Sequence, residues 1–526
     1  MKKWFLTAAA LLLCVAMASC STLSALPPSF SLDWGLSGYR TAEVFNGTGD
    51  GATDNTEALQ TAINKLGTKN AVLNLKTGVY VITGKVTVPS NITLRFAQGA
   101  SFLLQDNAEL NLDGAGVLAV QSQIFTGNGK VTGSSPSTAT PYWFGATFSG
   151  ADESVAVQKT VDVFAKVLIK NSSNGLRFGN VRLTKPVEIH GTGNSRAKVL
   201  MAASGHLFIL ASSDIHIANL NVTANGTQDK ESALFYFDTN ACSMSNIEIH
   251  NVYSTSPAYT VLDAQSSSNT VSNFTMTECT SSINYAEGIY MTDFTTGIVI
   301  QDVLINNVGV AHKINYPGWY MENVKEMLIE NGDAAGGLNT GDRGHGFMAV
   351  DCEGISFVRC MTDYVNGAGL YLKNCKNMYI NNMVVSLYEE EGYYFENVTD
   401  SVFDTVKANG IFGTLDFSDR GVRPALTLKN CKGITFNNLT MQYNQSNGLV
   451  LENSSNITVN SLSSMANRGS SLVEQAGSNN NVYNGVVSTN NYGDGALILT
   501  GSASKLVGAV YNGKYKGEHV GAVTLK

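Results

Sequence analysis

The sequence predicts an all-β protein, a right-handed parallel β-helix (solenoid) with a short N-terminal capping helix. A stepped pattern returns to one register along the C-terminal half of the chain, and each step carries an Asn or Asp that we take as its anchor. The anchors, at spacings of 30, 30, 28, 23, 23, 33 and 23 residues, are Asp263, Asp293, Asn323, Asp351, Asn374, Asn397, Asn430 and Asn453. Repeats of this length are typical of solenoids, in which each repeat packs only on its neighbours.

The residues around each anchor alternate as they do in a β-strand. Positions four and two before the anchor are apolar, as Leu370 and Leu372 illustrate, and so are positions four and six after it, as in Met378 and Ile380. Successive side chains of a strand point to opposite faces, so each step holds two or three short strands and has no room for a helix. Crossovers between parallel strands are nearly always right-handed, which sets the expected hand.

Two further columns run through the steps. Glycine recurs five positions before the anchor, at Gly288, Gly318, Gly346, Gly369, Gly392 and Gly448. We expect a bend there whose backbone angles only glycine tolerates. Cys352 and Cys375 share a second column in adjacent steps, where a disulfide would fit. A column of buried thiols is the favoured interpretation of that pair.

The N-terminus resembles a bacterial lipoprotein signal. Two lysines are followed by an apolar run to Met17, by small residues and by Cys20. The resemblance implies a signal peptide over residues 1–19, a lipid anchor on Cys20 that ties the protein to a membrane, and a tether over residues 20–40. Ser21 rather than an acidic residue follows the cysteine, which favours an outer-membrane lipoprotein at the cell surface or periplasmic face. No second segment approaches the roughly 20 apolar residues of a membrane span.

The composition fits one elongated domain that does not bind nucleic acid. Charged residues are 14% of the 526 residues, Gly totals 51, and the net charge is −8. An acidic balance argues against nucleic acid held by bulk electrostatics. No cysteine spacing is typical of a zinc site, and the sequence requires no cofactor, although calcium is left open.

Residues 41–140 form an N-terminal cap segment, and residues 141–526 form the β-helix proper. Asp54 and Glu57 precede a short amphipathic pattern and predict a helix start related to the capping box. The stretch Gly49-Asp50-Gly51-Ala52-Thr53-Asp54-Asn55-Thr56, with Gly78-Val79-Tyr80 and Val86-Thr87-Val88-Pro89 after it, resembles the pectate-lyase-like β-helix superfamily. A weaker second copy runs from Tyr142-Trp143 through Asp152-Glu153-Ser154 to Val187-Glu188-Ile189.

This resemblance is informative about fold and much less so about reaction. The superfamily includes polysaccharide lyases, glycoside hydrolases, uronan epimerases, phage tailspikes and noncatalytic proteins. The resemblance therefore implies a β-helix that acts on or binds a polysaccharide or oligosaccharide.

Insertions point to one wall of the solenoid as the site. They fall in the turn before the recurring glycine, at residues 280–287, 309–317, 332–345, 386–391 and 409–424. Functional groups tend to lie on such loops, which places the active-site region around residues 280–424. Beside the wall, an outward row of tyrosines is suited to stacking on sugar rings. The expected substrate-binding residues are Tyr290, His312, Tyr371, Lys373, Tyr394, Arg420 and Arg423.

The leading hypothesis is a polysaccharide lyase that cleaves a uronic-acid-containing glycan by β-elimination. Such a reaction needs cations beside the carboxylate and a base for the C5 proton. We expect Arg343 and Lys313 to face the carboxylate, His345 to act as base, and Tyr316 or Tyr320 to act as acid.

Two alternatives remain open. A glycoside hydrolase would use paired carboxylates, for which Asp342, Glu389, Glu391 and Asp416 are the candidates. A noncatalytic glycan-binding or adhesive lipoprotein would use the tyrosine row alone.

Overall fold

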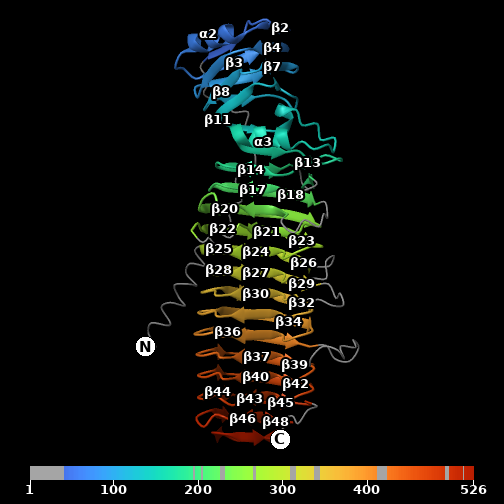
Figure 1. Cartoon of the computed structure of the whole chain (residues 1–526), viewed down its shortest axis with the longest axis vertical. Helices are drawn as coiled ribbons and strands as arrows, with labels where there is room; N and C mark the ends of the chain where they lie inside the picture. The colour runs from blue at the N-terminus through green and yellow to red at the C-terminus, as the bar shows by residue number, and fades with distance from the viewer. Residues whose placement is uncertain are drawn as a thin grey trace.

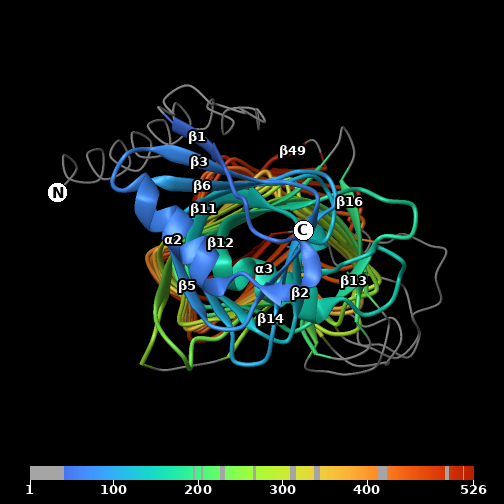
Figure 2. The ribbon, with the colours of Figure 1, turned by 90° about the horizontal axis from the view of Figure 1, so that it is seen from above.

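The computed structural model is a right-handed parallel β-helix whose rungs stack along one long axis (Figure 1). It describes residues 41–192, 196–202, 205–224, 232–264, 268–308, 316–336, 344–410, 423–491, 497–512 and 514–525. Seen from above, successive rungs superimpose around a common interior (Figure 2). No helix in these ranges is long and apolar enough to cross a membrane.

Fourteen strands form one sheet along the solenoid, called here the long sheet. In order they are β14 (Val181–Leu183), β17 (Phe208–Leu210), β19 (Ala233–Phe237), β21 (Tyr259–Asp263), β24 (Ile289–Thr292), β27 (Trp319–Glu322), β30 (Phe347–Val350), β33 (Leu370–Lys373), β35 (Tyr393–Glu396), β37 (Leu426–Lys429), β40 (Leu449–Glu452), β43 (Leu472–Glu474), β46 (Leu497–Leu499) and β51 (Val523–Leu525). Neighbours pair in parallel except β46 and β51, where the chain turns back and covers the last edge.

The remaining strands of the body complete each rung behind the long sheet. They are β12 (Phe164–Ile169), β13 (Leu176–Phe178), β15 (Val187–Gly191), β16 (Ala197–Met201), β18 (Ile215–Thr223), β20 (Met244–Thr255), β22 (Val271–Thr277), β23 (Thr280–Ser282), β25 (Thr295–Gln301), β26 (Leu304–Val308), β28 (Lys325–Glu330), β29 (Asp333–Gly336), β31 (Ser356–Val358), β32 (Met361–Val365), β34 (Tyr379–Tyr388), β36 (Val402–Asn409), β38 (Thr435–Phe436), β39 (Leu439–Gln442), β41 (Thr458–Val459), β42 (Leu462–Met465), β44 (Val482–Asn484), β45 (Val486–Thr489), β47 (Lys505–Val507), β48 (Val510–Tyr511), β49 (Lys514–Tyr515) and β50 (His519–Val520). Three segments predicted as insertion loops thus have strands in their first parts, since β23, β29 and β34 extend into 280–287, 332–345 and 386–391; β36 also includes Asn409, the first residue of 409–424.

The N-terminal part is built from shorter rungs and two α-helices. Its strands are β1 (Thr41–Val44), β2 (Asp50–Asp54), β3 (Ala71–Leu75), β4 (Gly78–Ile82), β5 (Lys85–Pro89), β6 (Ile92–Phe96), β7 (Ala100–Leu104), β8 (Glu109–Asp113), β9 (Gly116–Leu118), β10 (Phe125–Gly127) and β11 (Lys130–Ala139). The helices are α2 (Thr56–Leu66), the short 3₁₀ turn η1 (Pro141–Phe144) and α3 (Ser154–Val163). One helix was predicted, and the second α-helix belongs to the second copy of the N-terminal pattern.

Asp54 holds the start of α2 without a capping box. Its Oδ1 accepts hydrogen bonds from the backbone N of Thr56 at 2.9 Å and from the Thr56 hydroxyl at 2.6 Å. Asp152 does the same for Ser154 at the start of α3, with a distance of 3.0 Å to the backbone N. The side chain therefore closes a local Asx turn, and the predicted helix start is confirmed, with Thr56 rather than Glu57 as the partner of Asp54.

Buried side chains form two hydrophobic clusters. One joins residues from Phe45 to Phe164, and the other joins residues from Ala146 to Ala509. Strand β11 pairs with both β8 and β12, so sheet pairing runs on between the two parts. The division at residues 140 and 141 stays a prediction.

The anchors form an asparagine ladder at one corner of the rungs. Asp351, Asn374 and Asn397 adopt φ angles of 54°, 53° and 55°, a left-handed conformation that Asn and Asp tolerate. Asn374 Nδ2 donates to Asp351 Oδ1 at 2.9 Å, and Asn397 Nδ2 donates to Asn374 Oδ1 at 2.7 Å. Each side-chain amide thus donates a hydrogen bond to the side-chain oxygen of the preceding rung. Asp263 was wrongly taken as an anchor: it is buried and accepts a 2.9 Å hydrogen bond from the backbone N of Thr292.

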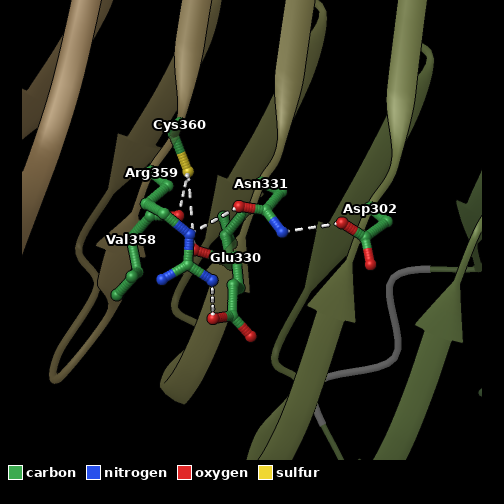
Figure 3. Close-up of polar contacts among 7 residues, drawn as sticks. Asp302, Glu330, Asn331, Val358, Arg359 and Cys360 are labelled. Atoms are coloured by element: carbon green, nitrogen blue, oxygen red, sulfur yellow. Dashed lines mark hydrogen bonds and ion pairs between the residues drawn. The ribbon is translucent and has the colours of Figure 1, made fainter.

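A second ladder runs along the corner between β25, β28 and β31 and the strands that follow them. Figure 3 shows Asn331 Nδ2 donating to Asp302 Oδ1 at 2.7 Å and Arg359 Nε donating to Asn331 Oδ1 at 2.8 Å. Arg359 also forms an ion pair with Glu330. An arginine can therefore replace asparagine in the ladder because its guanidinium supplies the same donor.

The recurring glycines are explained by crowding and not by backbone angle. None of them has a φ in the left-handed region. A Cβ added to Gly346 would lie 2.2 Å from Thr362 Cγ2, and one added to Gly369 would lie 2.1 Å from Val385 Cγ1. The expected need for special angles is therefore wrong, because close packing against the neighbouring strand excludes the Cβ.

All six cysteines in the described ranges are free, which agrees with the favoured thiol column. Cys352 and Cys375 are buried in adjacent rungs, with Lys376 N bonded to Cys352 O at 3.1 Å.

Candidate functional site

The candidate site is a column of side chains where the chain enters the long sheet. The strand registers align the residue that precedes each recurring glycine across successive rungs, and we call this line the edge column. In chain order it holds His206, Ala233, Tyr259, Glu287, Pro317, His345, Ala368 and Glu391. The insertions predicted from the sequence lead directly into this column.

Beside the edge column lies the tyrosine row, the outward position of each long-sheet strand. It comprises Tyr236, Leu262, Tyr290, Tyr320, Met348, Tyr371, Tyr394 and the buried Thr427. The Tyr290 and Tyr320 rings stack with centroids 4.9 Å apart, and those of Tyr371 and Tyr394 stack at 5.2 Å. All four are half-buried, so part of each side chain is accessible to a ligand.

Glu287 is a buried carboxyl surrounded by phenols. Only 8% of its surface is exposed, and Oε2 has no hydrogen-bond partner. Burial raises the pKa of Glu287 to about 7, although a hydrogen bond from Tyr259 partly opposes the rise. Burial, followed by the charge of Glu287, raises the pKa values of Tyr259 and Tyr316. This group joins one carboxyl that titrates near neutrality to two phenols that stay protonated.

His345 stands two rungs farther along the edge column. Its Nδ1 accepts a hydrogen bond from the backbone N of Ala368 at 2.9 Å, and its ring lies 4.9 Å from that of Tyr371. Burial lowers the pKa of His345 to about 4, so the ring is neutral at pH 7 and carries its proton on Nε2. This arrangement suits a hydrogen-bond donor better than the base that the sequence suggested.

Glu391 repeats the setting of Glu287 four rungs away. It is 6% exposed, and burial raises its pKa to about 7, with Arg423 opposing the rise and Glu390 adding to it. Glu389 belongs to the same short segment, and its Oε2 is buried. Rungs are about 4.8 Å apart, so Glu287 and Glu391 are about 19 Å apart and cannot form one catalytic pair. Among the predicted carboxyls that lie within the described residues, pairing is feasible only between those of the 389–391 segment.

The other predicted residues divide into two groups. Tyr320 donates its hydroxyl to Glu322 Oε2 at 2.9 Å, and burial is the main cause of its raised pKa. Lys373 is half-buried on the face of the long sheet, and Arg423 is exposed beside Glu391. His312, Lys313, Asp342, Arg343, Asp416, Arg420 and Cys20 lie outside the described residues.

Sequence reasoning missed Tyr259 and Glu287 as members of the site, and it missed His206 as a member of the edge column. The signal was available for Glu287, since Glu287-Gly288, His345-Gly346 and Glu391-Gly392 all place a titratable residue directly before the recurring glycine. Tyr259 and His206 precede no such glycine, and only strand register places them in the column.

A second acidic pair lies away from the edge column, on β29 and β32. Burial, with Asp363 as the next cause, raises the pKa of Asp333 to about 6, and burial raises that of Asp363. Within the described ranges no group of three His, Cys, Asp or Glu side chains could hold a metal ion.

No protein-family profile and no curated protein matches the chain. Among solved structures it is similar to the full-length tailspike protein 2 of Escherichia coli O157:H7 bacteriophage CAB120, with 13% identity and a TM-score of 0.35 over 63% of this chain and 42% of the tailspike. The A-module of the Azotobacter vinelandii mannuronan C-5 epimerase AlgE4 is similar at 12% identity and a TM-score of 0.33, over 89% of this chain and 100% of the module. An N-terminal fragment of bacteriophage Phi29 gene product 12 has 12% identity and a TM-score of 0.35, over 91% of this chain and 73% of the fragment. The likeness is one of fold alone.

Proposed function

We propose that the protein is a polysaccharide-cleaving enzyme that binds its polymer along Tyr290, Tyr320, Tyr371 and Tyr394 of the tyrosine row and transfers protons through buried glutamates of the edge column. The observation that carries the proposal is the side-by-side placement of half-exposed, stacked tyrosines and carboxyls with pKa values of about 7. Aromatic faces suit sugar rings, and a carboxyl that titrates near the working pH is an efficient proton donor or acceptor.

Hydrolysis is the chemistry that this geometry supports best. In this scheme Glu391, protonated below about pH 7, gives a proton to the glycosidic oxygen, while Glu389 or Glu390 activates water or attacks the sugar. Acidic side chains such as Glu287, Glu322 and Glu391 line this face of the long sheet. Such a face favours a neutral polymer over a polyuronate, because like charges repel.

β-Elimination on a uronic-acid polymer is the second candidate, and the Glu287 group favours it. A carboxyl with a pKa of about 7 beside the protonated phenol of Tyr316 supplies a base and an acid at one place. Glu287 is then a better base than His345, whose Nδ1 is occupied by Ala368. Lys313 and Arg343 keep their proposed role of neutralising the substrate carboxylate.

A panel of soluble polysaccharides tests both schemes. It contains uronic-acid polymers (alginate, polygalacturonate, hyaluronan) and neutral ones (dextran, xylan, galactomannan), and each reaction is read for new reducing ends and for ultraviolet absorbance of an unsaturated product. Reducing ends without absorbance indicate hydrolysis, and absorbance indicates elimination. If neither signal appears on any polymer, the enzyme proposal is wrong.

Three variants assign the chemistry. Under hydrolysis, Glu391→Gln should lower kcat by about 10²- to 10⁴-fold. Under elimination, Glu287→Gln should do so instead. Glu188→Gln is the control, since Glu188 is a half-buried glutamate on β15, behind the long sheet, and it should leave kcat unchanged.

We also propose that Cys20 carries a lipid that anchors the protein to the outer membrane. The support is the signal-like N-terminal sequence. Cys20→Ser should move the protein from the membrane fraction to the soluble fraction and abolish labelling with a radioactive fatty acid. Unlabelled wild-type protein would contradict the anchor.

A further inference from the structure

The arrangement around His345 occurs a second time in the molecule. His206 and His345 each follow a glycine and stand two residues before a buried phenylalanine, Phe208 or Phe347. Both lie in the edge column, and both face a tyrosine of the next rung. The repeat was not visible as a sequence period because five rungs of unequal length separate the two copies.

The contacts of the two histidines match. The His206 ring lies 4.1 Å from the Tyr236 ring with the planes 8° apart, and the His345 ring lies 4.9 Å from the Tyr371 ring at 31°. His206 Nδ1 accepts a hydrogen bond from Ala233 N at 3.2 Å, as His345 Nδ1 accepts one from Ala368 N. Each alanine stands three residues before its tyrosine.

The surroundings of the two copies differ in one respect that matters for chemistry. His345 has Glu287 and Glu391 of the edge column two rungs away on either side, whereas Tyr259 stands two rungs after His206 and Glu287 three rungs after it. The copy at His206 has instead an ion pair on the outer face, with Arg182 Nη2 2.5 Å from Asp238 Oδ2. It therefore has groups that bind a polar ring and no edge-column glutamate on the next two rungs.

We propose that His206 and Tyr236, with the Arg182–Asp238 pair at their edge, form a second polysaccharide-binding platform that holds a distant segment of the polymer being cleaved. The proposal rests on the proposed function. A pyranose ring offers an apolar face to the stacked rings and hydroxyls to the charged pair. The two histidines are five rungs apart on one face, about 24 Å along the axis, so one extended chain reaches both.

Two linked platforms raise affinity for long chains only. A short oligosaccharide occupies one platform, while a polymer that spans both gains the second contact at high effective concentration. The second platform therefore acts on the KM for polymer and leaves turnover of short oligosaccharides unchanged.

The experiment is affinity electrophoresis of the full-length protein through gels that contain each polysaccharide of the panel, together with kinetics on polymer and on short oligosaccharides. Tyr236→Ala and His206→Ala should each weaken retention of polymer by about 3- to 10-fold, as expected for the loss of one ring contact. Both should raise the KM for polymer and leave kcat on short oligosaccharides as in the wild type. Val473→Ala, in the same outward position near the C-terminal end, is the matched control.

Tyr236→Phe distinguishes the loss of a ring contact from a folding defect. This variant keeps the stacked ring and should bind polymer with an affinity within about 2-fold of that of the wild type. Polymer retention unchanged in both Tyr236→Ala and His206→Ala, with retention lost in Tyr371→Ala, would overturn the second platform and leave the proposed function standing. A wild-type protein that retains and cleaves no polymer would overturn both. Equal weakening by Val473→Ala would also overturn the platform, because the effect would not be local.

Discussion

Replacing Glu287 by glutamine should stabilise the protein above about pH 7 and have little effect near pH 4. Burial raises the pKa of Glu287 from 4.5 to about 7, so the folded protein holds a proton that the unfolded chain gives up. The contribution of this carboxyl is therefore fully present below pH 4.5 and is lost as the pH rises through about 7. Glutamine keeps an oxygen to accept the Tyr259 hydroxyl and carries no charge at any pH.

The size of the effect follows from the interval between the two pKa values. Each pH unit of that interval corresponds to about 1.4 kcal/mol, so ionising Glu287 in the folded protein costs about 3 kcal/mol. With only 8% of the residue exposed, solvent does little to reduce this figure. The free energy of unfolding of Glu287→Gln should exceed that of the wild type by about 3 kcal/mol at pH 8.5.

The assay is urea unfolding followed by circular dichroism at pH 4 and pH 8.5. Glu452→Gln is the control, because it makes the same substitution at a half-buried glutamate of the same sheet, away from the Glu287 group. Equal unfolding midpoints for Glu287→Gln and the wild type at both pH values would refute the reasoning. That result would mean that water reaches the carboxyl in the folded protein.

Three further outcomes are expected. The rate of polymer cleavage, which depends on protonated Glu391, should fall about tenfold per pH unit above about pH 7, and the pH–rate profile should show no change of slope near pH 6.5 from His345. A change of slope near pH 6.5 that is lost in His345→Ala would contradict this expectation. Gly369→Ala should lower the free energy of unfolding in urea by about 1 to 3 kcal/mol, because its Cβ would lie 2.1 Å from Val385 Cγ1; an unchanged midpoint would show that the neighbour moves freely. Asn374→Gly should be less destabilising than Asn374→Ala by about 1 to 2 kcal/mol, since the φ of 53° strains alanine; the reverse order of thermal midpoints would argue against left-handed strain at this corner.

Local chemistry made much of the fold readable from the sequence. Asn374 and Asn397 recur because one position per rung needs a left-handed residue with a side-chain donor, and that need is the same in every rung. The alternation of Leu370 and Leu372 follows from a strand with one face inside. Asp263 was misassigned because an Asp that faces inward and one at the corner look alike until the register is known.

The site was readable only in part. Tyr290, Tyr320, Tyr371 and Tyr394 could be placed on one outward row, because their positions depend on the period alone. The pKa of Glu287, the occupied Nδ1 of His345 and the match between His206 and His345 could not, because each depends on a neighbouring rung about 25 residues away. The sequence by itself determined the solenoid, its inward columns and its asparagine corner, since each of these features recurs once in every rung. The tertiary structure alone decided which side chains share the edge column and which of them are desolvated, since burial and contact depend on how rungs of unequal length pack on one another.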